Sequence, residues 1–133
     1  NELSGKVIVY SYSDGKLKEL QSIAADNANA HGGADIHVSP DGMFVYTSTR
    51  LKGDGITIFR VGNKGTLTRV GAQLTGKHPR NFAITPNGNF LLVACRDDNS
   101  IQVYSRDKDT GLLKNTHQDI VLSHPVCVKF YPE

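Results

Sequence analysis

Apolar and polar residues alternate along most of this chain with the period of two that is typical of β-strands. Residues 7–12, 56–61 and 101–104 show the alternation clearly, and each run is followed by a polar or glycine-containing turn. Residues 17–25 are ambiguous, because their leucines and isoleucine would also suit one face of a helix. The pattern therefore predicts short strands joined by tight turns, with one segment open between strand and helix.

A repeat of 46 residues organises these runs. The segment GGADIHVSPDGMFVYTSTR (32–50) returns as GKHPRNFAITPNGNFLLVACR (76–96) and begins again as SHPVCVKFYPE (123–133). The prolines at positions 40, 86 and 132 are 46 apart both times (86 − 40 and 132 − 86). A period in the forties is typical of a repeat architecture. It also assigns residues 17–25 to a strand, because the Gly-Lys-Leu that opens them matches a Gly-Thr-Leu in the next repeat.

Each repeat has the same internal order of elements. An apolar run leads into Pro-Asp-Gly or Pro-Asn-Gly, and Asp41-Gly42 and Asn87-Gly88 are predicted to supply the positive φ angles of a tight hairpin turn. A second β-rich run, a polar loop, an alternating strand, a glycine-containing turn and a last strand follow. Four short antiparallel strands in such a repeat make one blade of a β-propeller.

The predicted fold class is all-β, a partial β-propeller of four-stranded antiparallel blades. Its units are a partial blade (1–31), two complete blades (32–77 and 78–122) and the inner strand of a closing blade (123–133), with the strand itself at Val126–Tyr131. At 46 residues per unit, 133 residues give 133/46, about 2.9 units, fewer than the roughly four to eight blades of a closed propeller. We therefore expect the C-terminal part of a larger propeller, with the remaining N-terminal blades as its packing partner.

Composition argues against several classes of function. The net charge of +2 is too small, and the basic residues too dispersed, to indicate nucleic-acid binding. No stretch of about 18 apolar residues is present, so no membrane span is predicted. Cys95 and Cys127 lack metal-ligand spacing, and we expect both to be buried free thiols, which fits a reducing, cytoplasmic location. The sequence also lacks motifs for metal binding, phosphate loops or a serine nucleophile.

Charged residues occupy equivalent loop positions in successive repeats. In a propeller, the loop into each inner strand and the loop after each second strand share one rim, where ligand pockets form. The candidate rim residues are Glu2, Arg50, Arg96, Asp35, His78 and Arg80. A carboxylate after one second strand and guanidinium groups after the next two suggest an anionic ligand with a base nearby. The alternative is an inter-blade salt bridge between Glu2 and Arg50, which needs no ligand.

Other polar positions favour structural roles. His37 lies in mid-strand, and we expect it to hold neighbouring strands in register rather than to act in catalysis. Asp35 is expected to tie a loop to backbone amides. His78 and His124 each precede a proline, which favours a shared role in shaping loops over ligand contact. One repeat position is predicted to be core in each blade: Tyr10, Phe59 and Tyr104.

Four segments together resemble the lactonase family of seven-bladed β-propellers: NELSGKVIVY, ADIHVSPDGMFVYTSTR, HPRNFAITPNGNFLLVACRDDNSIQVY and HPVCVKF. This family includes propeller-type 6-phosphogluconolactonases and fungal carboxy-muconate lactonizing enzymes. The resemblance covers essentially the whole chain. It implies hydrolysis of a small anionic sugar lactone without a cofactor, with 6-phosphoglucono-1,5-lactone giving 6-phosphogluconate as the leading case.

The resemblance also implies roles for individual residues. The glutamate of the family's NEL motif falls on Glu2, and the arginine that ends a second-strand triplet falls on Arg50, so these two are the expected catalytic residues. The expected substrate-binding residues are Arg80, Arg96, His37, Asp35 and His78. Arg96 could instead pair with Asp97 or Asp98. In this hypothesis Arg50, helped by Arg80 or Arg96, polarises the lactone carbonyl. Glu2 deprotonates or orients the attacking water.

Two alternatives to lactone hydrolysis stay open. A propeller can bind a ligand or a protein on the same rim without catalysis, because a fold does not guarantee an activity. A muconate-type lactonizing cycloisomerase would use the rim for a different acid. A Glu2–Arg50 pair beside an open pocket would favour the enzyme, whereas a salt bridge locked in a filled rim would favour the binding protein.

Overall fold

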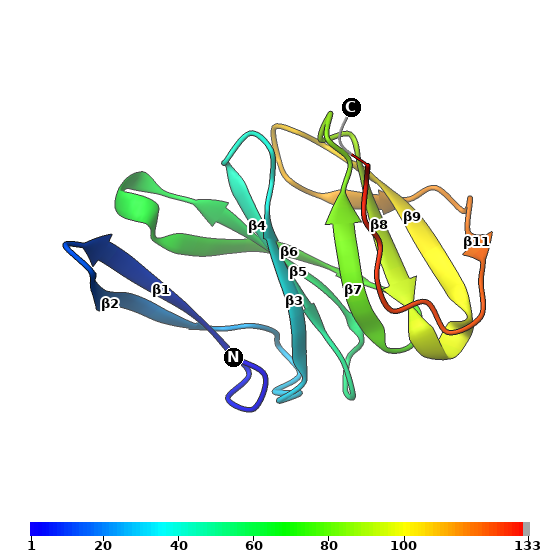
Figure 1. The fold of residues 1–133 in the computed structure, drawn as a ribbon, viewed down its shortest axis with the longest axis horizontal. Helices are drawn as coiled ribbons and strands as arrows, with labels where there is room; N and C mark the ends of the chain where they lie inside the picture. The colour runs from blue at the N-terminus through cyan, green and yellow to red at the C-terminus, as the bar shows by residue number, and fades with distance from the viewer. Residues whose placement is uncertain (132–133) are drawn as a thin grey trace.

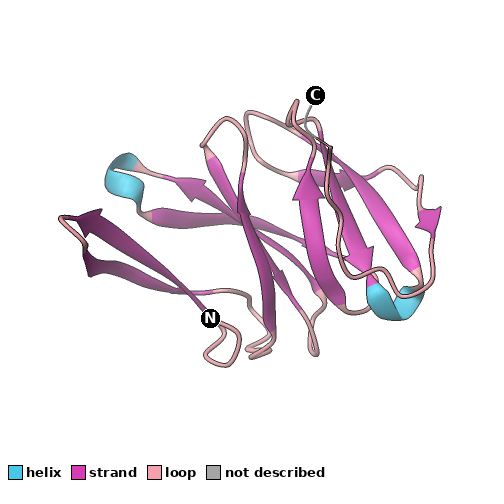
Figure 2. Ribbon diagram, viewed as in Figure 1, coloured by secondary structure: helices cyan, strands magenta, loops and turns pink. Residues whose placement is uncertain are grey.

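Antiparallel β-strands form three sheets in the computed structural model, which describes residues 1–131 (Figure 1). The strands are β1 (Lys6–Ser13), β2 (Lys16–Ala24), β3 (Gly33–Val38), β4 (Phe44–Thr49), β5 (Gly55–Val61), β6 (Leu67–Leu74), β7 (Pro79–Ile84), β8 (Phe90–Cys95), β9 (Ser100–Arg106), β10 (Leu113–Asn115) and β11 (Ile120–Val121). Within the described residues, helical structure is limited to two 3-10 turns, η1 (Asn63–Gly65) and η2 (Arg96–Asp98) (Figure 2).

Each sheet follows the chain order that a propeller blade requires. β1 and β2 form a hairpin, β3 to β6 form a four-stranded sheet, and β7 to β10 form the next one in the same order. The all-β prediction is confirmed, and so is the strand at residues 17–25, which is β2. The blade boundaries drawn from the sequence concern units of the whole domain, and they stay predictions.

The Pro-Asp-Gly and Pro-Asn-Gly segments form the predicted turns, but by a different conformation. Gly42 and Gly88 have φ angles of 72°, while Asp41 and Asn87 are absent from the positive-φ residues, so the expectation for those two was wrong. Asp41 Oδ1 instead accepts the N–H of the residue two positions on at 2.9 Å, and Asn87 Oδ1 does the same at 3.0 Å. This side-chain contact holds the turn without a left-handed Asp or Asn, because it replaces a missing backbone hydrogen bond.

β4 is the most deeply buried strand, because a neighbouring sheet covers each of its faces. Its side chains alternate between two core clusters, as the period of two requires. The cluster between the two larger sheets contains Phe44, Tyr46, Ile56, Ile58, Phe82, Leu91, Val93, Cys95 and Tyr104. The cluster against the β1–β2 hairpin contains Val7, Ala25, Val45, Phe59 and Leu67. The core prediction holds for Phe59 and Tyr104 but was wrong for Tyr10, which is 47% exposed because no further sheet covers its side of the hairpin within the described residues.

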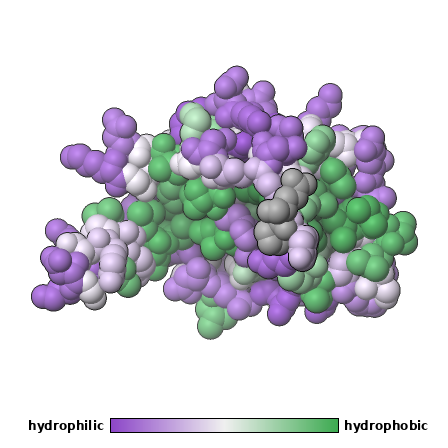
Figure 3. All heavy atoms as spheres, turned by 45° about the horizontal axis from the view of Figure 1, so that its top comes forward, coloured by the Kyte–Doolittle hydropathy of each residue, from purple (hydrophilic) through white to green (hydrophobic). Residues whose placement is uncertain are grey.

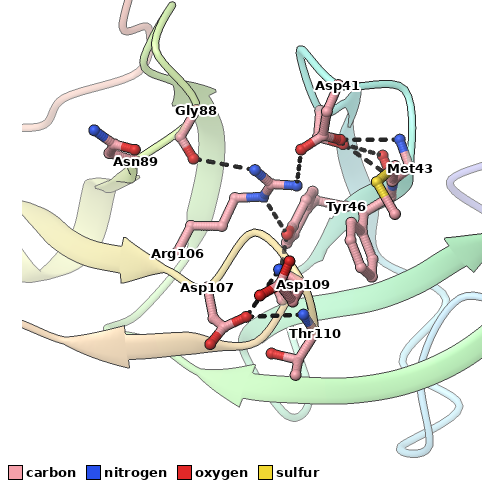
Figure 4. A network of polar contacts seen from close by, with 12 residues as sticks. Asp41, Met43, Tyr46, Gly88, Asn89, Arg106, Asp107, Asp109 and Thr110 are labelled. Atoms are coloured by element: carbon pink, nitrogen blue, oxygen red, sulfur yellow. Dashed lines mark hydrogen bonds and ion pairs between the residues drawn. The ribbon is translucent and has the colours of Figure 1, made fainter.

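A buried arginine joins the two larger sheets at the end opposite to the candidate rim (Figure 4). The Arg106 side chain is fully buried and donates to Asp41 Oδ2 at 2.6 Å, to the Tyr46 hydroxyl at 2.8 Å and to the Gly88 carbonyl at 3.1 Å. All three nitrogens of the guanidinium therefore have partners. Such full satisfaction is what makes a buried charge tolerable, and it ties the turn before β4 to the end of β9.

The outer strand of the second large sheet is interrupted. β10 and β11 both pair with β9, and the Thr116 N–H still donates to the Val103 carbonyl, but residues 117–119 leave the ladder. Asn115 Oδ1 accepts the N–H of His117 at 2.7 Å, and His117 adopts a positive φ of 57°. This local turn competes with strand pairing and divides the single strand that the repeat predicts.

Residues 126–131 do not form the predicted inner strand. The segment runs alongside β7 (Figure 1), where the Val128 N–H donates to Asn81 Oδ1 at 2.7 Å. A strand requires a backbone ladder with a neighbouring strand, and this contact is made by a side chain instead. Pro132, the third proline of the repeat, lies outside the described residues, as does Glu133.

The two cysteines differ in environment. Cys95 is buried as predicted, and burial raises the pKa of its thiol to about 12. Cys127 is exposed, so the expectation that it is buried was wrong. It lies in the segment without strand pairing, where no sheet covers it within the described residues.

Large apolar side chains also lie on the surface, and Figure 3 shows them gathered across the middle of one face. Ile36 and Val38 on β3 are 53% and 60% exposed, on the side that faces the hairpin. Contiguous apolar surface of this kind marks an interaction site in a soluble protein. The sequence-based hypothesis places further blades here, and that packing stays a prediction.

Candidate functional site

A chain of charged and polar side chains crosses one rim of the molecule, from Glu2 through Arg50, His78 and Asp97 to Arg96. Glu2 precedes β1, Arg50 follows β4 directly, His78 precedes β7 directly, and the last two lie in η2 after β8. The loops meet because equivalent strand ends of successive sheets lie on the same rim. The structure thus brings together four of the residues that the sequence singled out.

Arg50 is the centre of this chain and is only 7% exposed. Its Nη2 donates to Glu2 Oε1, and its Nη1 lies 3.3 Å from His78 Nε2 in hydrogen-bonding geometry. Its Nε is buried without a hydrogen-bond partner among residues 1–131. The Glu2 side chain is 56% exposed, so the carboxylate end of the pair is open to solvent. One N–H of the guanidinium is therefore left unpaired within residues 1–131, in a buried position.

The surroundings of His78 disfavour its protonated form. Burial lowers its pKa below the ordinary value, and the positive charges of Arg96, Arg50 and Arg80 lower it further, against the opposing effect of Asp97. Its φ of 58° is unusual for a non-glycine residue. Backbone contacts hold the loop, since the His78 carbonyl accepts the N–H of Arg96 at 3.1 Å.

Arg96 is paired with its neighbour. Its Nε donates to Asp97 Oδ1 at 2.7 Å, and this hydrogen bond lowers the pKa of the Asp97 carboxyl. The sequence is compatible with ligand binding by Arg96 or with a pair to an adjacent aspartate, and the structure contains the pair with Asp97. Both side chains are partly exposed, so the bond is of the weak surface kind that an anion can exchange.

Arg80 differs from the other rim arginines. It is exposed on β7 and makes no side-chain hydrogen bond or ion pair within residues 1–131. Its positive charge still acts on a neighbouring rim residue, because it helps to lower the pKa of His78. An unpaired guanidinium beside this chain of contacts is suited to an anionic ligand group.

Asp35 and His37 belong to a separate network that joins β3 to β7. Asp35 Oδ2 accepts from Asn81 Nδ2 at 2.5 Å and from the Phe82 N–H at 3.2 Å, and it lies 3.0 Å from His37 Nε2. Burial acts to raise the pKa of Asp35, but the hydrogen bond from His37 and those from the Phe82 and Ile36 amides outweigh it and lower the pKa. The expectation that Asp35 ties backbone amides is confirmed, whereas substrate binding by these two residues stays a prediction.

A similar contact, from a side-chain oxygen to a backbone N–H, occurs between β7 and residues 126–131. There Asn81 has the position that Asp35 has on β3. Asn81 Oδ1 accepts the Val128 N–H, and the partners are 47 residues apart in both cases. The sequence matched Asp35 with Asn81 but did not indicate their partners. It named Asp97 only as a possible partner of Arg96, and it did not indicate the contact of Asp97 with His78.

A hollow of about 480 Å³ lies beside the rim, between the hairpin and β3. Glu2 and Asp35 line it together with Ser48, while Arg50 and Arg80 do not. Glu2 thus lines the hollow, and its carboxylate accepts a hydrogen bond from Arg50. Among residues 1–131, no group of three or more histidine, cysteine or acidic side chains is arranged to hold a metal ion.

The family model described as "Lactonase, 7-bladed beta-propeller" matches residues 1–130. The chain belongs to this lactonase family. The partial β-propeller predicted from the repeat is therefore confirmed.

Several relatives of this lactonase-family chain have names that fit the family assignment. A 6-phosphogluconolactonase of Formosa agariphila is 44% identical, over 92% of this chain and 36% of that protein. The crystal structure of a candidate 6-phosphogluconolactonase from Bacteroides fragilis has a TM-score of 0.96 and 58% identity, over 99% of this chain and 37% of that one. The periplasmic gluconolactonase of Pseudomonas aeruginosa has a TM-score of 0.90 and 30% identity, over 98% and 38%. The chain thus spans little more than a third of the length of these relatives.

Proposed function

We propose that the complete protein hydrolyses a sugar lactone, with 6-phosphoglucono-1,5-lactone as the leading substrate and 6-phosphogluconate as the product. The observation that carries this proposal is the Glu2–Arg50 pair, in which Glu2 is exposed and lines a hollow while the buried guanidinium keeps one donor without a partner among residues 1–131. Relatives named 6-phosphogluconolactonase support the choice of substrate.

The geometry suits a hydrolysis in which charge develops on the lactone carbonyl oxygen. Water attacks the carbonyl carbon, and the Glu2 carboxylate accepts the proton that the water loses. Arg50 stabilises the oxyanion of the tetrahedral intermediate through its guanidinium donors, which are positioned before the reaction. The bond to the ring oxygen then breaks, and the ring oxygen takes the proton that Glu2 holds. The carboxylic acid that forms releases its own proton to solvent, which leaves the carboxylate product and restores the Glu2 carboxylate. Arg80 is the residue best placed to attract the substrate phosphate, because its charge is unpaired among the described residues.

A second candidate, a propeller that binds an anion without turning it over, is favoured by one observation. Glu2 and Arg50 already form a salt bridge without any ligand, which is the arrangement expected of a structural inter-blade contact. The exposure of Glu2 and the open hollow weigh toward the enzyme. A muconate-type cycloisomerase remains the other alternative, and the substrate panel below separates it from the hydrolase.

The cytoplasmic location stays a prediction. Within residues 1–131, no helix has the length and apolarity that crossing a membrane requires. The relative from Pseudomonas aeruginosa is named as periplasmic, so the compartment does not follow from the family.

The deciding assay is hydrolysis of 6-phosphogluconolactone by the complete protein, measured against the spontaneous rate and beside unphosphorylated gluconolactone and a muconolactone. We expect hydrolysis well above background that depends on the phosphate. Turnover of the muconolactone alone would indicate the cycloisomerase. Binding of 6-phosphogluconate with no acceleration of any lactone would indicate the non-catalytic alternative and refute the proposed hydrolase.

Replacing Glu2 by glutamine in the complete protein is expected to lower kcat about 100-fold, because a positioned general base contributes roughly 10²–10⁴-fold. The amide keeps the size of the side chain but cannot accept a proton at neutral pH. KM should change little, since Arg50 and Arg80 still bind the anion. The matched control is Glu19→Gln, which alters an exposed glutamate on β2 and should leave kcat unchanged. Unchanged kcat in Glu2→Gln would remove Glu2 from the mechanism.

A further inference from the structure

We propose that His78 and Asp97 form a positioning pair that holds the Arg50 guanidinium in its working orientation. The inference rests on the proposed function, because the orientation matters for a lactone carbonyl. The two residues lie on a different sheet from Arg50, so the pair would align a group across the interface between two blades. Glu2 approaches Arg50 from the other side, and the guanidinium is held between the two.

The hydrogen-bonding roles follow from the chemistry of arginine. A guanidinium only donates, so His78 Nε2, which lies 3.3 Å from Arg50 Nη1, has to be the unprotonated, accepting nitrogen of the ring. The proton of the neutral imidazole is then on Nδ1. That nitrogen faces Asp97 Oδ2 at 3.4 Å, and a carboxylate at this position favours the Nδ1–H tautomer. Asp97 therefore acts on Arg50 through the tautomer of His78.

The charges around His78 make the arrangement sensitive to acid. Arg50 contacts the ring from the end of β4, and Asp97 faces it from η2. The charges of Arg80 on β7 and Arg96 on η2 also act on it electrostatically. Asp54 approaches the backbone, where its Oδ2 accepts the His78 N–H at 3.3 Å. Protonation would place an Nε2–H against the Arg50 donor and remove the acceptor. Arg50 would then lose this contact as the pH falls through the lowered pKa of His78.

A role in shaping the loop does not account for these ring contacts. His124, at the equivalent place in the next repeat, shares the positive φ, but its ring contacts Ser123 and no arginine or aspartate among residues 1–131. The equivalent residue in the preceding repeat is Gly32, which has no side chain. Any side chain there would clash, because an added Cβ would lie 2.3 Å from the Arg50 carbonyl oxygen. The pairing of an imidazole with an arginine and an aspartate is thus particular to His78 within the described interfaces.

Two variants of the complete protein separate positioning from loop shape. His78→Gln keeps an acceptor near the position of Nε2 but cannot titrate in this range. We expect its kcat/KM at pH 8 to stay within about threefold of the wild-type value. The part of the activity loss at acid pH that comes from protonation of His78 should be absent in this variant. His78→Asn tolerates positive φ but is too short to reach Arg50. We expect its kcat/KM to fall at least about tenfold, because a hydrogen bond to a charged group is lost.

The matched control is His117→Asn, which changes an exposed histidine with nearly the same φ, 57°, and no ring hydrogen bond or ion pair within residues 1–131. It should leave both kcat/KM and the pH profile unchanged. If His78→Asn also folds and keeps the wild-type kcat/KM and pH profile, the positioning role is refuted.

A measurement on the wild-type protein keeps the inference testable if the variants fail to fold or if no lactone is turned over. Imidazole ¹⁵N chemical shifts of the neutral ring report its tautomer, and the signal is assigned by its loss in His78→Gln or, failing that, in His78→Asn. The Nδ1–H tautomer is expected, with a shift toward the Nε2–H form in Asp97→Asn. An Nε2–H tautomer in the wild type would overturn the positioning pair whatever the outcome of the lactone assay. An Nδ1–H tautomer in a protein without lactonase activity would refute only the proposed function.

Discussion

Replacing Arg50 by methionine in the complete protein is expected to lower kcat/KM about 1,000-fold. Removal of one preorganised donor to an oxyanion costs about 10²–10³-fold in rate, and Arg50 also contributes positive charge to substrate binding. The buried guanidinium has contacts to Glu2 and His78, so its loss would also release both of these side chains. The steady-state kinetics of lactone hydrolysis, corrected for the spontaneous rate, measure the effect.

Two further variants define the role of Arg50. Arg50→Lys keeps the positive charge but loses the planar guanidinium with its paired donors. Compared with Arg50→Met, we expect it to restore KM more fully than kcat. Arg69→Met is the matched control, because Arg69 on β6 is bonded to Asn27 and not to any of the candidate site residues. Should Arg50→Met retain turnover close to that of Arg69→Met, the salt bridge with Glu2 would be structural and the non-catalytic alternative would gain support.

Replacing Arg106 by methionine is expected to lower the free energy of unfolding by about 3 kcal/mol, the lower end of the range for removing one partner of a buried ion pair. Asp41 is partly exposed, which limits the cost of leaving its carboxylate without a counter-charge. Tyr46 and the Gly88 carbonyl lose donors in the same change (Figure 4). Urea denaturation of the complete protein measures the difference.

Arg60→Met provides the comparison for Arg106→Met. Both guanidinium groups lie over the ring of Phe44, at 4.8 Å for Arg60 and 5.4 Å for Arg106, but Arg60 is exposed. We expect Arg60→Met to cost less than about 1 kcal/mol, as for exposed pairs. Equal losses in the two variants would show that contact with the Phe44 ring, and not the buried network, provides the stability.

Acid should weaken the same network. Burial acts to raise the pKa of Asp41, but hydrogen bonds from Ser39, Met43 and Arg106 outweigh it and lower the pKa to about 2. The unfolded value is about 3.9, so this contribution to stability is present above about pH 4 and is lost as the pH falls toward 2. In Arg106→Met the pKa of Asp41 should rise, and the pH dependence of unfolding over this range should become shallower.

The repeat made much of the fold predictable. A period of 46 residues, with the same order of turns, identified the strands and resolved the helix-like stretch at residues 17–25. The rim followed from the same alignment, because equivalent positions in a repeat occupy equivalent places in space. The prediction failed where a local hydrogen bond, or the absence of a covering sheet within residues 1–131, outweighed the pattern: at the turn after Asn115, at Tyr10, at Cys127 and at residues 126–131.

The candidate site shows the same division. Sequence identified Glu2, Arg50, Arg96 and His78 as neighbours on one rim, since each follows or precedes a strand at a matched position. It left open which of them touch, because a contact depends on the path of a side chain and on its competition for partners. The structure pairs Arg96 with Asp97, which the sequence had named only as one possible partner of Arg96.

By itself, the sequence determined the strand order, the repeat and the family, because these depend on periodic burial and turn residues that can be read locally. Only the tertiary structure decided which charges are paired and which donor of Arg50 has no partner among residues 1–131. It also showed that Asp35 and His37 link two sheets and do not belong to the series of contacts around Arg50. Hydrogen bonds and ion pairs join residues about 30 to 65 positions apart here, within a few ångströms. Such contacts depend on how the sheets pack, and no local pattern of residues specifies them.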